Sequence, residues 1–323
     1  MYDNCTFWID RFDIGEETFI NLSNILTNVK EEINHETGEC KIRGNLKNLS
    51  IMQNDVGISI KGSLSRFYYW DDDEGKRGNL FPLDRRETEK AIKLLTDNLD
   101  GIPMDKAKVR SLEFGSFIPV KKEVSEYLKR CGDYPRLERC LFQEETLYYK
   151  HRGKRQPKML CLYDKKKDAI HKGYTIPEGF ENYNLLKYEL RLKGSIGRQL
   201  KYDEVTGETL YEKLFYGKLK DLYYKEFNKI IKIPCVEFEF KRSIKSVGDA
   251  EEILLSMLIQ EKGIDIIEDF IRRLKAEYVF NDRANYSRLR KKLNEIMQKS
   301  VPLNFDPLLR DLENGIANMC LYA

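Results

Sequence analysis

The stretch LYDKKKD at residues 162–168 places a tyrosine at the end of a short apolar run and three lysines directly beyond it. A tyrosine hydroxyl has a pKa of about 10 and is a weak nucleophile, so nearby ammonium groups or a metal ion are needed to favour its anion. The same lysines could offset charge that develops on a phosphate. Tyr163 is therefore a candidate nucleophile. The alternative interpretation is an aromatic residue that packs at a strand end before a solvated turn.

Two glutamates lie in segments with alternating apolar and polar residues, VRSLEFGSF and LLKYELRLK. Because successive side chains of a strand point to opposite faces, Glu113 shares a face with a serine and a glycine, and Glu189 shares a face with three basic residues. If the two strands are neighbours, these carboxylates could hold a hard cation such as Mg²⁺ or Mn²⁺. They could also be solvated acids paired with lysines and arginines.

The segment HRGKRQPK, residues 151–158, is strongly basic and lies between two predicted strands. A basic hairpin tip can follow a phosphate backbone. Two tyrosines just before it, Tyr148 and Tyr149, could stack on bases, although strand tyrosines more often pack on their neighbours. The candidate DNA-binding residues of this segment are Arg152, Lys154, Arg155 and Lys158.

Composition excludes several classes of protein. Basic residues exceed acidic ones by only three, so bulk charge does not indicate a nucleic-acid partner and any basic surface must be local. The seven cysteines are scattered and odd in number, which argues against a disulfide framework or a zinc ribbon and favours the cytoplasm. No glycine-rich phosphate loop, signal peptide or apolar stretch of membrane-spanning length is found.

The elements that must position these residues follow from the periodicity of the chain. Residues from Cys5 to about 70 alternate with period two, which indicates strands and hairpins, and a helix capped by Asp84 follows and ends before Gly101. We expect an α+β fold, with an antiparallel or mixed sheet that has helices on one side, of the ferredoxin-like kind. After about residue 205 most segments show helical spacing, except a strand candidate at residues 235–241. The expected domains are residues 1–205 and a mainly helical domain, 206–323.

Four stretches occur in the order IKGSLSRFYYW, KVRSLEFGSF, TLYYKHRGKRQPKMLCLYDK and LLKYELRLKG, spread over about residues 56–200. This order resembles the replication initiators of filamentous phages and small plasmids known as the gene II/gene X family, which are rolling-circle nicking endonucleases with a HUH-like core. The resemblance implies that Tyr163 attacks a DNA phosphodiester, becomes joined to the 5′ phosphate and frees a 3′ hydroxyl. It also implies Lys165 as a catalytic lysine and Glu113 and Glu189 as metal ligands.

The sequence lacks the His-x-His motif of the broader nickase superfamily, so the resemblance implies a metal held mainly by carboxylates, and hence Mg²⁺ or Mn²⁺. The implied partners are single-stranded or supercoiled origin DNA and, for the helical domain, duplex origin DNA or a host helicase. A cytoplasmic protein without a membrane partner is expected. Two alternatives stay open: a DNA-binding replication regulator that does not cut, and an ordinary binding or scaffold protein. Participation of a second tyrosine, such as Tyr149, is also open.

Overall fold

The computed structural model describes residues 1–14, 22–33, 35–70, 81–176, 178–194, 196–233, 244–299 and 306–322. These residues form an α+β fold built on one ten-stranded sheet with the order β2-β3-β4-β5-β1-β6-β10-β9-β8-β7. Every pair of neighbouring strands is antiparallel. The expectation of an α+β chain with a large antiparallel sheet is confirmed.

Strands β1 to β5 form one half of the sheet and β6 to β10 form the other, and β1 and β6 join the two halves at the centre. The strands are β1 (Tyr2–Asp10), β2 (Thr27–Ile33), β3 (Cys40–Leu46), β4 (Leu49–Asn54), β5 (Gly57–Ser63), β6 (Lys108–Val120), β7 (Glu138–Phe142), β8 (Thr146–Lys150), β9 (Lys158–Asp164) and β10 (Asn184–Lys193). The α-helices are α1 (Arg11–Ile14), α2 (Leu64–Tyr68), α3 (Arg85–Asn98), α4 (Val124–Lys129), α5 (Lys165–His171), α6 (Ile196–Leu200), α7 (Gly207–Tyr211), α8 (Lys213–Asn228), α10 (Val247–Lys262), α11 (Asp265–Ala276), α12 (Arg283–Lys299) and α13 (Pro307–Tyr322).

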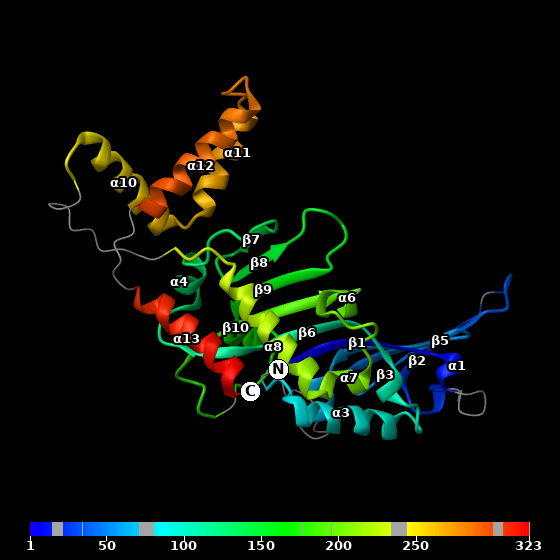
Figure 1. Cartoon of the computed structure of the whole chain (residues 1–323). Helices are drawn as coiled ribbons and strands as arrows, with labels where there is room; N and C mark the ends of the chain where they lie inside the picture. The colour runs from blue at the N-terminus through cyan, green and yellow to red at the C-terminus, as the bar shows by residue number, and fades with distance from the viewer. Residues whose placement is uncertain are drawn as a thin grey trace.

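Helix α8 lies against one face of the central strands (Figure 1), and aromatic side chains hold it there. The ring of Phe114 in β6 contacts Tyr216 and Tyr223 of α8, with centroids 5.6 and 5.7 Å apart. Tyr188 in β10 lies 4.4 Å from Tyr223. Helix α13 covers the same face of β6, where Gly315 leaves room for Ile118: a Cβ on Gly315 would come within 2.5 Å of that side chain. The opposite face of these strands carries polar residues and also a small apolar cluster, in which Phe117 and Leu185 pack against Ile176 and Phe180.

Local capping explains two helices, one predicted and one missed. The helix predicted after Asp84 is confirmed as α3, and Asp84 and Glu87 form a reciprocal capping box at its start. The prediction of strands up to about residue 70 is wrong for residues 64–68, which form α2. There Ser63 accepts a hydrogen bond from the backbone N–H of Arg66, so a side-chain cap ends β5 and begins the helix.

The helices after residue 205 pack in two groups. Helices α7, α8 and α13 contribute to the same hydrophobic core as the sheet. The domain boundary predicted at residue 205 therefore falls within one continuous core. Helices α10, α11 and α12 share a second, smaller core that includes Ile259, Ile267 and Ile271. Figure 1 shows these three helices projecting beyond β7. The strand candidate at residues 235–241 lies outside the described residues.

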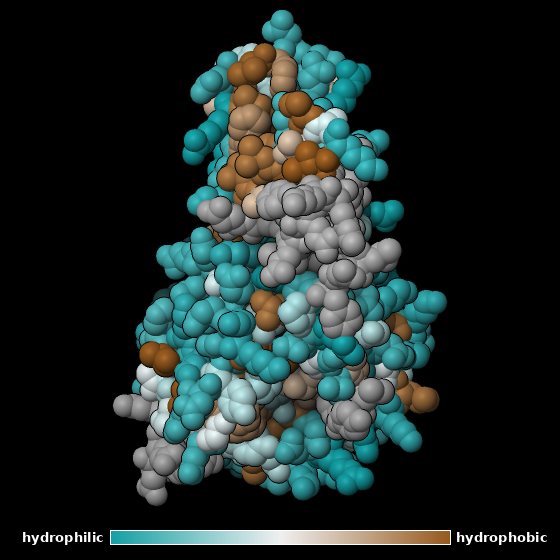
Figure 2. Space-filling view, turned by 90° about the vertical axis from the view of Figure 1, so that its left-hand side faces the viewer, coloured by the Kyte–Doolittle hydropathy of each residue, from teal (hydrophilic) through white to brown (hydrophobic). Residues whose placement is uncertain are grey.

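The small helical group exposes apolar side chains. Figure 2 shows them gathered where α10, α11 and α12 lie, and on α10 they include Leu254, Leu255, Met257 and Leu258. Among the described helices, none is both long and apolar enough to pass through a lipid bilayer.

Candidate metal and nucleophile site

The two predicted glutamates lie on the same face of neighbouring strands. In the register of β6 against β10, Glu113 pairs with Arg191 and Gly115 pairs with Glu189. Paired residues of an antiparallel ladder point to the same side, so both carboxylates lie on the face opposite α8. Gly115 is needed for this close pairing, because a Cβ there would come within 2.2 Å of the carbonyl oxygen of Tyr188.

A bulge in β1 adds a third carboxylate that alternation does not predict. The register of β1 against β6 shifts between Tyr2 and Cys5, so Asp3 and Asn4 lie opposite the single residue Glu113. A bulge of this kind can re-aim a side chain, and here both Asp3 and Asn4 reach the polar face. Asn4 Nδ2 donates a hydrogen bond to Glu113 Oε2 at 2.6 Å.

These three acids form a cluster. One carboxylate oxygen from each of Asp3, Glu113 and Glu189 lies within 4.8 Å of the other two. Asp3 and Glu189 are buried and Glu113 is half-buried. Oxygen ligands at this density suit a hard divalent cation. The cluster could therefore hold a metal ion.

Two basic residues of β10 already balance much of this charge. Lys187 Nζ lies 2.7 Å from Asp3 Oδ2 and 2.7 Å from Glu189 Oε1. Arg191 Nη2 donates to Glu189 Oε2 at 2.6 Å, and its Nε lies 3.3 Å from Glu113 Oε1. A cation bound by all three acids would have to displace the ammonium of Lys187 from its position.

Tyr163 lies on β9 beside this cluster. It pairs with Lys187 across β9 and β10, and its hydroxyl donates a hydrogen bond to Glu189 Oε1 at 3.0 Å. The ring is half-buried rather than enclosed in the hydrophobic core. A hydroxyl bonded to a carboxylate is the arrangement of a nucleophile with an adjacent proton acceptor.

The other predicted catalytic residue, Lys165, is the first residue of α5 and is buried. Its Nζ lies 5.9 Å from the centroid of the Tyr163 ring and 3.3 Å from Asp168 Oδ2. The ammonium thus faces the ring of the tyrosine, and Lys187 Nζ lies at a similar distance of 6.0 Å from the same centroid. The resemblance implies a role for Lys165, whereas alternation places Lys187 only among the three basic residues that share a face with Glu189.

Burial and charge act in opposite directions on the ionisable groups of the cluster. Burial raises the pKa of Tyr163 well above its usual value, and the ammonium of Lys187 only partly opposes this effect. Burial would also raise the pKa of Glu189, but Lys187 and Arg191 outweigh it and hold that pKa below its usual value. Burial and the charge of Glu189 raise the pKa of Glu113. Tyr163 is therefore protonated at neutral pH unless further positive charge lies beside it.

The basic segment does connect β8 to β9 as a hairpin, with three of its four cations at the tip. Arg152, Lys154 and Arg155 are exposed. Lys158 is different: it lies on the opposite face of β9, where its Nζ lies 2.6 Å from Glu226 Oε2 of α8. This position does not support the prediction of Lys158 as a DNA-binding residue, because its ammonium is paired with the buried carboxylate of Glu226.

A second catalytic tyrosine is not available at Tyr149. This side chain is fully buried, and its hydroxyl donates a hydrogen bond to the carbonyl of Gly132 at 2.7 Å. Alternation along β8 puts Tyr148 on the face of Cys161 and Glu189 instead.

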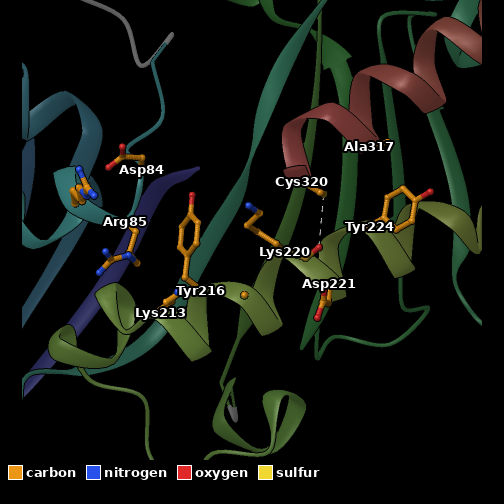
Figure 3. Close-up of a pocket in the computed structure, with 11 residues that line it drawn as sticks. Asp84, Arg85, Lys213, Tyr216, Lys220, Asp221, Tyr224, Ala317 and Cys320 are labelled. Atoms are coloured by element: carbon orange, nitrogen blue, oxygen red, sulfur yellow. Dashed lines mark hydrogen bonds between the residues drawn. The ribbon is translucent and has the colours of Figure 1, made fainter. Parts of the chain in front are cut away.

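The structure also contains a hollow of about 810 Å³ away from the carboxylates (Figure 3). It lies between α8, α13 and the start of α3. Its lining residues are Asp84, Arg85, Arg86, Lys213, Tyr216, Gly217, Lys220, Asp221, Tyr224, Ala317 and Cys320. Because α8 and α13 cover the other face of the sheet, this hollow is separate from the carboxylate cluster.

Comparison with protein-family models and with curated proteins finds no match for this chain. Function is therefore inferred from the site and from the resemblance in the order of motifs.

Proposed function

We propose that this protein is a replication initiator that nicks one DNA strand at an origin through a covalent 5′-phosphotyrosine intermediate, in the manner of the gene II/gene X family. The observation that carries the proposal is the hydrogen bond from Tyr163 to Glu189, in a cluster that also contains Asp3 and Glu113. An acceptor for the tyrosine proton and a set of oxygen ligands for a cation thus lie on one sheet face.

The proposed reaction is a transesterification. The phenol oxygen of Tyr163 forms a bond to phosphorus, its proton passes to Glu189, and the bond from phosphorus to the 3′ oxygen breaks. The released 3′ oxygen takes up a proton and becomes the hydroxyl that primes synthesis. The phosphotyrosine keeps the energy of the ester, so the strand can later be rejoined without a nucleotide cofactor.

Asp3, Glu113 and Glu189 are the residues that would hold Mg²⁺ or Mn²⁺. When bound, the ion supplies positive charge that favours the phenolate and polarises the phosphate. This addition matters here, because burial holds the pKa of Tyr163 well above its usual value. Lys165, whose Nζ lies 5.9 Å from the centroid of the Tyr163 ring, would offset charge on the phenolate or the phosphate.

A second candidate function is DNA binding without cleavage, as in a replication regulator. One observation favours it: Lys187 and Arg191 already pair with the acids of the cluster. A site balanced in this way is stable without a metal ion.

The decisive experiment incubates the protein with Mn²⁺ and origin-bearing single-stranded DNA, digests it, and identifies by mass spectrometry any peptide that carries nucleotide. We expect the label on Tyr163. The variant Tyr163→Phe should lose the adduct and the nicking of supercoiled plasmid while it keeps its DNA affinity, because only the attacking oxygen is removed.

The variant Tyr148→Phe is the matched control, since Tyr148 lies on the adjacent strand and on the same face. It should form the adduct. An adduct on another residue would overturn the assignment of Tyr163, and DNA binding with no adduct at any residue would favour the regulator.

A further inference from the structure

The polar sheet face extends well beyond the carboxylate cluster, along β1. From Asn4 onward, burial alternates along β1, and Cys5, Phe7 and Ile9 point into the core. Thr6 and Trp8 therefore lie on the same face as Asn4. This face of β1 continues onto β5, where Lys61 pairs with Thr6 and Ser59 pairs with Trp8. Lys61 is exposed, and Ser59 and Trp8 are half-buried. An accessible indole thus lies among small and basic residues.

The indole of Trp8 lies between a glycine and an arginine. A Cβ on Gly57 would come within 2.9 Å of Cζ2 of Trp8, so the ring lies close over the backbone of β5. The guanidinium carbon of Arg110 lies over the ring, 4.4 Å from its centroid. Arg110 is the extra residue where the register of β1 against β6 shifts between Thr6 and Phe7, and its side chain is exposed.

A similar group lies at the end of the sheet nearer Tyr163. The guanidinium of Arg66 in α2 lies 5.7 Å from the ring centroid of Trp70 and 5.1 Å from that of Tyr174. Arg66 Nη1 also donates to the hydroxyl of Tyr174 at 3.0 Å. This α2 group follows Ser63, whose hydroxyl donates to Asp3 Oδ1 at 2.7 Å. The carboxylate cluster therefore lies between two groups in which an arginine contacts a tryptophan.

We propose that Trp8 with Arg110, and Trp70 with Arg66 and Tyr174, are base-stacking sites that hold single-stranded DNA along β1, so that it passes over the carboxylate cluster. The proposal deepens the proposed function and rests on it for the nature of the substrate. Aromatic rings and arginines bind unpaired bases without regard to sequence, and the nearby cations bind the phosphates.

The geometry favours a single strand over a duplex. A base can stack on a side chain of a flat sheet only when it is unpaired and turned out of its helix. Asp3 and Trp8 are five positions apart on β1, about 17 Å at the usual rise of a strand. That distance places the stacking site several nucleotides from the scissile phosphate. The exposed tip that carries Arg152, Lys154 and Arg155 lies at the same end of the sheet as Trp8, since β9 begins there.

Trp8 and Trp70 are the two tryptophans of the chain, so fluorescence can report on each separately. The variant Tyr163→Phe, Trp70→Phe is titrated with oligodeoxythymidine in EDTA, where no cleavage takes place. We expect quenching of the Trp8 emission on single-stranded DNA and much less on the matching duplex. In the Tyr163→Phe protein, Trp8→Ala or Arg110→Ala should weaken binding of the single strand by about tenfold. Arg86→Ala removes an exposed arginine from the helix-covered side and should leave the affinity unchanged.

The outcomes separate the two proposals. Tight binding with an unquenched Trp8, or with no loss of affinity in Arg110→Ala, overturns the stacking path and leaves the proposed function standing. Quenching and weakened binding in the variants, together with no adduct at Tyr163 in the metal-loaded protein, supports the path and overturns cleavage. Absence of any binding to single-stranded DNA overturns both.

Discussion

The most informative residue of the site is Lys187, whose ammonium is almost fully buried between two acids. Burial alone would lower the pKa of Lys187, but Asp3 and Glu189 outweigh it and raise that pKa above its usual value. A buried charge of this kind is stable only while its partners are present. Lys187 therefore contributes to folding and also occupies the place that a metal ion would need.

This position leads to a prediction for Lys187→Met. The substitution leaves Asp3 and Glu189 buried without the ammonium, so we expect the free energy of unfolding to fall by about 3–5 kcal/mol. Saturating Mn²⁺ should recover part of that loss, because an ion that binds only the folded protein stabilises it. Thermal unfolding with and without Mn²⁺ measures both effects.

The control is Lys167→Met, which removes an exposed lysine paired with Glu145 at the surface. It should cost about 1 kcal/mol or less and show no added response to Mn²⁺. Absence of any Mn²⁺ shift of the melting temperature, in Lys187→Met as well as in the unmodified protein, would contradict a metal site at this cluster.

At the scale of elements, the site depends on how β9 and α8 are joined across the sheet. Glu226 of α8 is buried and lies 2.6 Å from Lys158 of β9 and 2.6 Å from Lys229. The hydroxyl of Tyr134 also donates to it. Because β9 carries Tyr163 on its other face, this buried ion pair helps to fix the strand that presents the candidate nucleophile.

The ion pair has a predictable pH dependence. Burial would raise the pKa of Glu226, but its hydrogen bonds with Lys158 and Lys229 outweigh this and lower it below the usual 4.5. A lowered pKa in the folded state gives stability that is full above the unfolded pKa and is lost as the pH falls through the folded one. We expect Glu226→Gln to lower the free energy of unfolding by about 2 kcal/mol at neutral pH.

Urea unfolding across a range of pH checks this prediction. The difference between Glu226→Gln and the unmodified protein should shrink as the pH falls below about 4.5. Glu89→Gln serves as a control, since the exposed pair of Glu89 with Lys93 lies on the surface of α3 and should show a much smaller effect. A difference that is the same in acid and at neutral pH would show that the carboxylate charge of Glu226 does not stabilise the fold.

At the scale of the whole molecule, the presence of two hydrophobic cores predicts that the three small helices and the sheet unfold with different free energies. The core of α10, α11 and α12 is small and contains Ile271, whereas Ile316 of α13 belongs to the core of the sheet. Arg139 of β7 pairs with Asp265 of α11, so an ion pair joins the small helical group to the sheet. Groups of elements with their own cores often open as separate units.

Ile271→Ala should therefore destabilise the three small helices selectively. Loss of a buried isoleucine costs about 2–5 kcal/mol, and hydrogen exchange should quicken at amides of α10, α11 and α12 while the strands keep their protection. Ile316→Ala should give the opposite pattern, with faster exchange in the sheet. Equal loss of protection in the strands and in the small helices of Ile271→Ala would show that the chain opens as one unit.

Much of the site could be predicted from local patterns. Alternation in VRSLEFGSF and LLKYELRLK predicts which face of its strand Glu113 and Glu189 each occupy. The apolar run before Tyr163 predicts that this tyrosine lies at the end of a strand. The cap of α3 at Asp84 was equally predictable, because a cap depends on neighbours three positions away.

Only the tertiary structure decided which strands lie side by side and which side chains meet. Tyr2 and Cys5 are both buried although they lie three positions apart, so alternation along β1 does not decide which face Asp3 takes. The bulge that lets Asp3 reach the polar face depends on pairing with the partner strand β6. Likewise, the sequence groups Lys158 with the other basic residues of the hairpin tip, but in the folded protein its ammonium pairs with Glu226 of α8. Strand order and bulges arise from contacts between residues far apart in the chain, and period and spacing within one segment carry no information about such contacts.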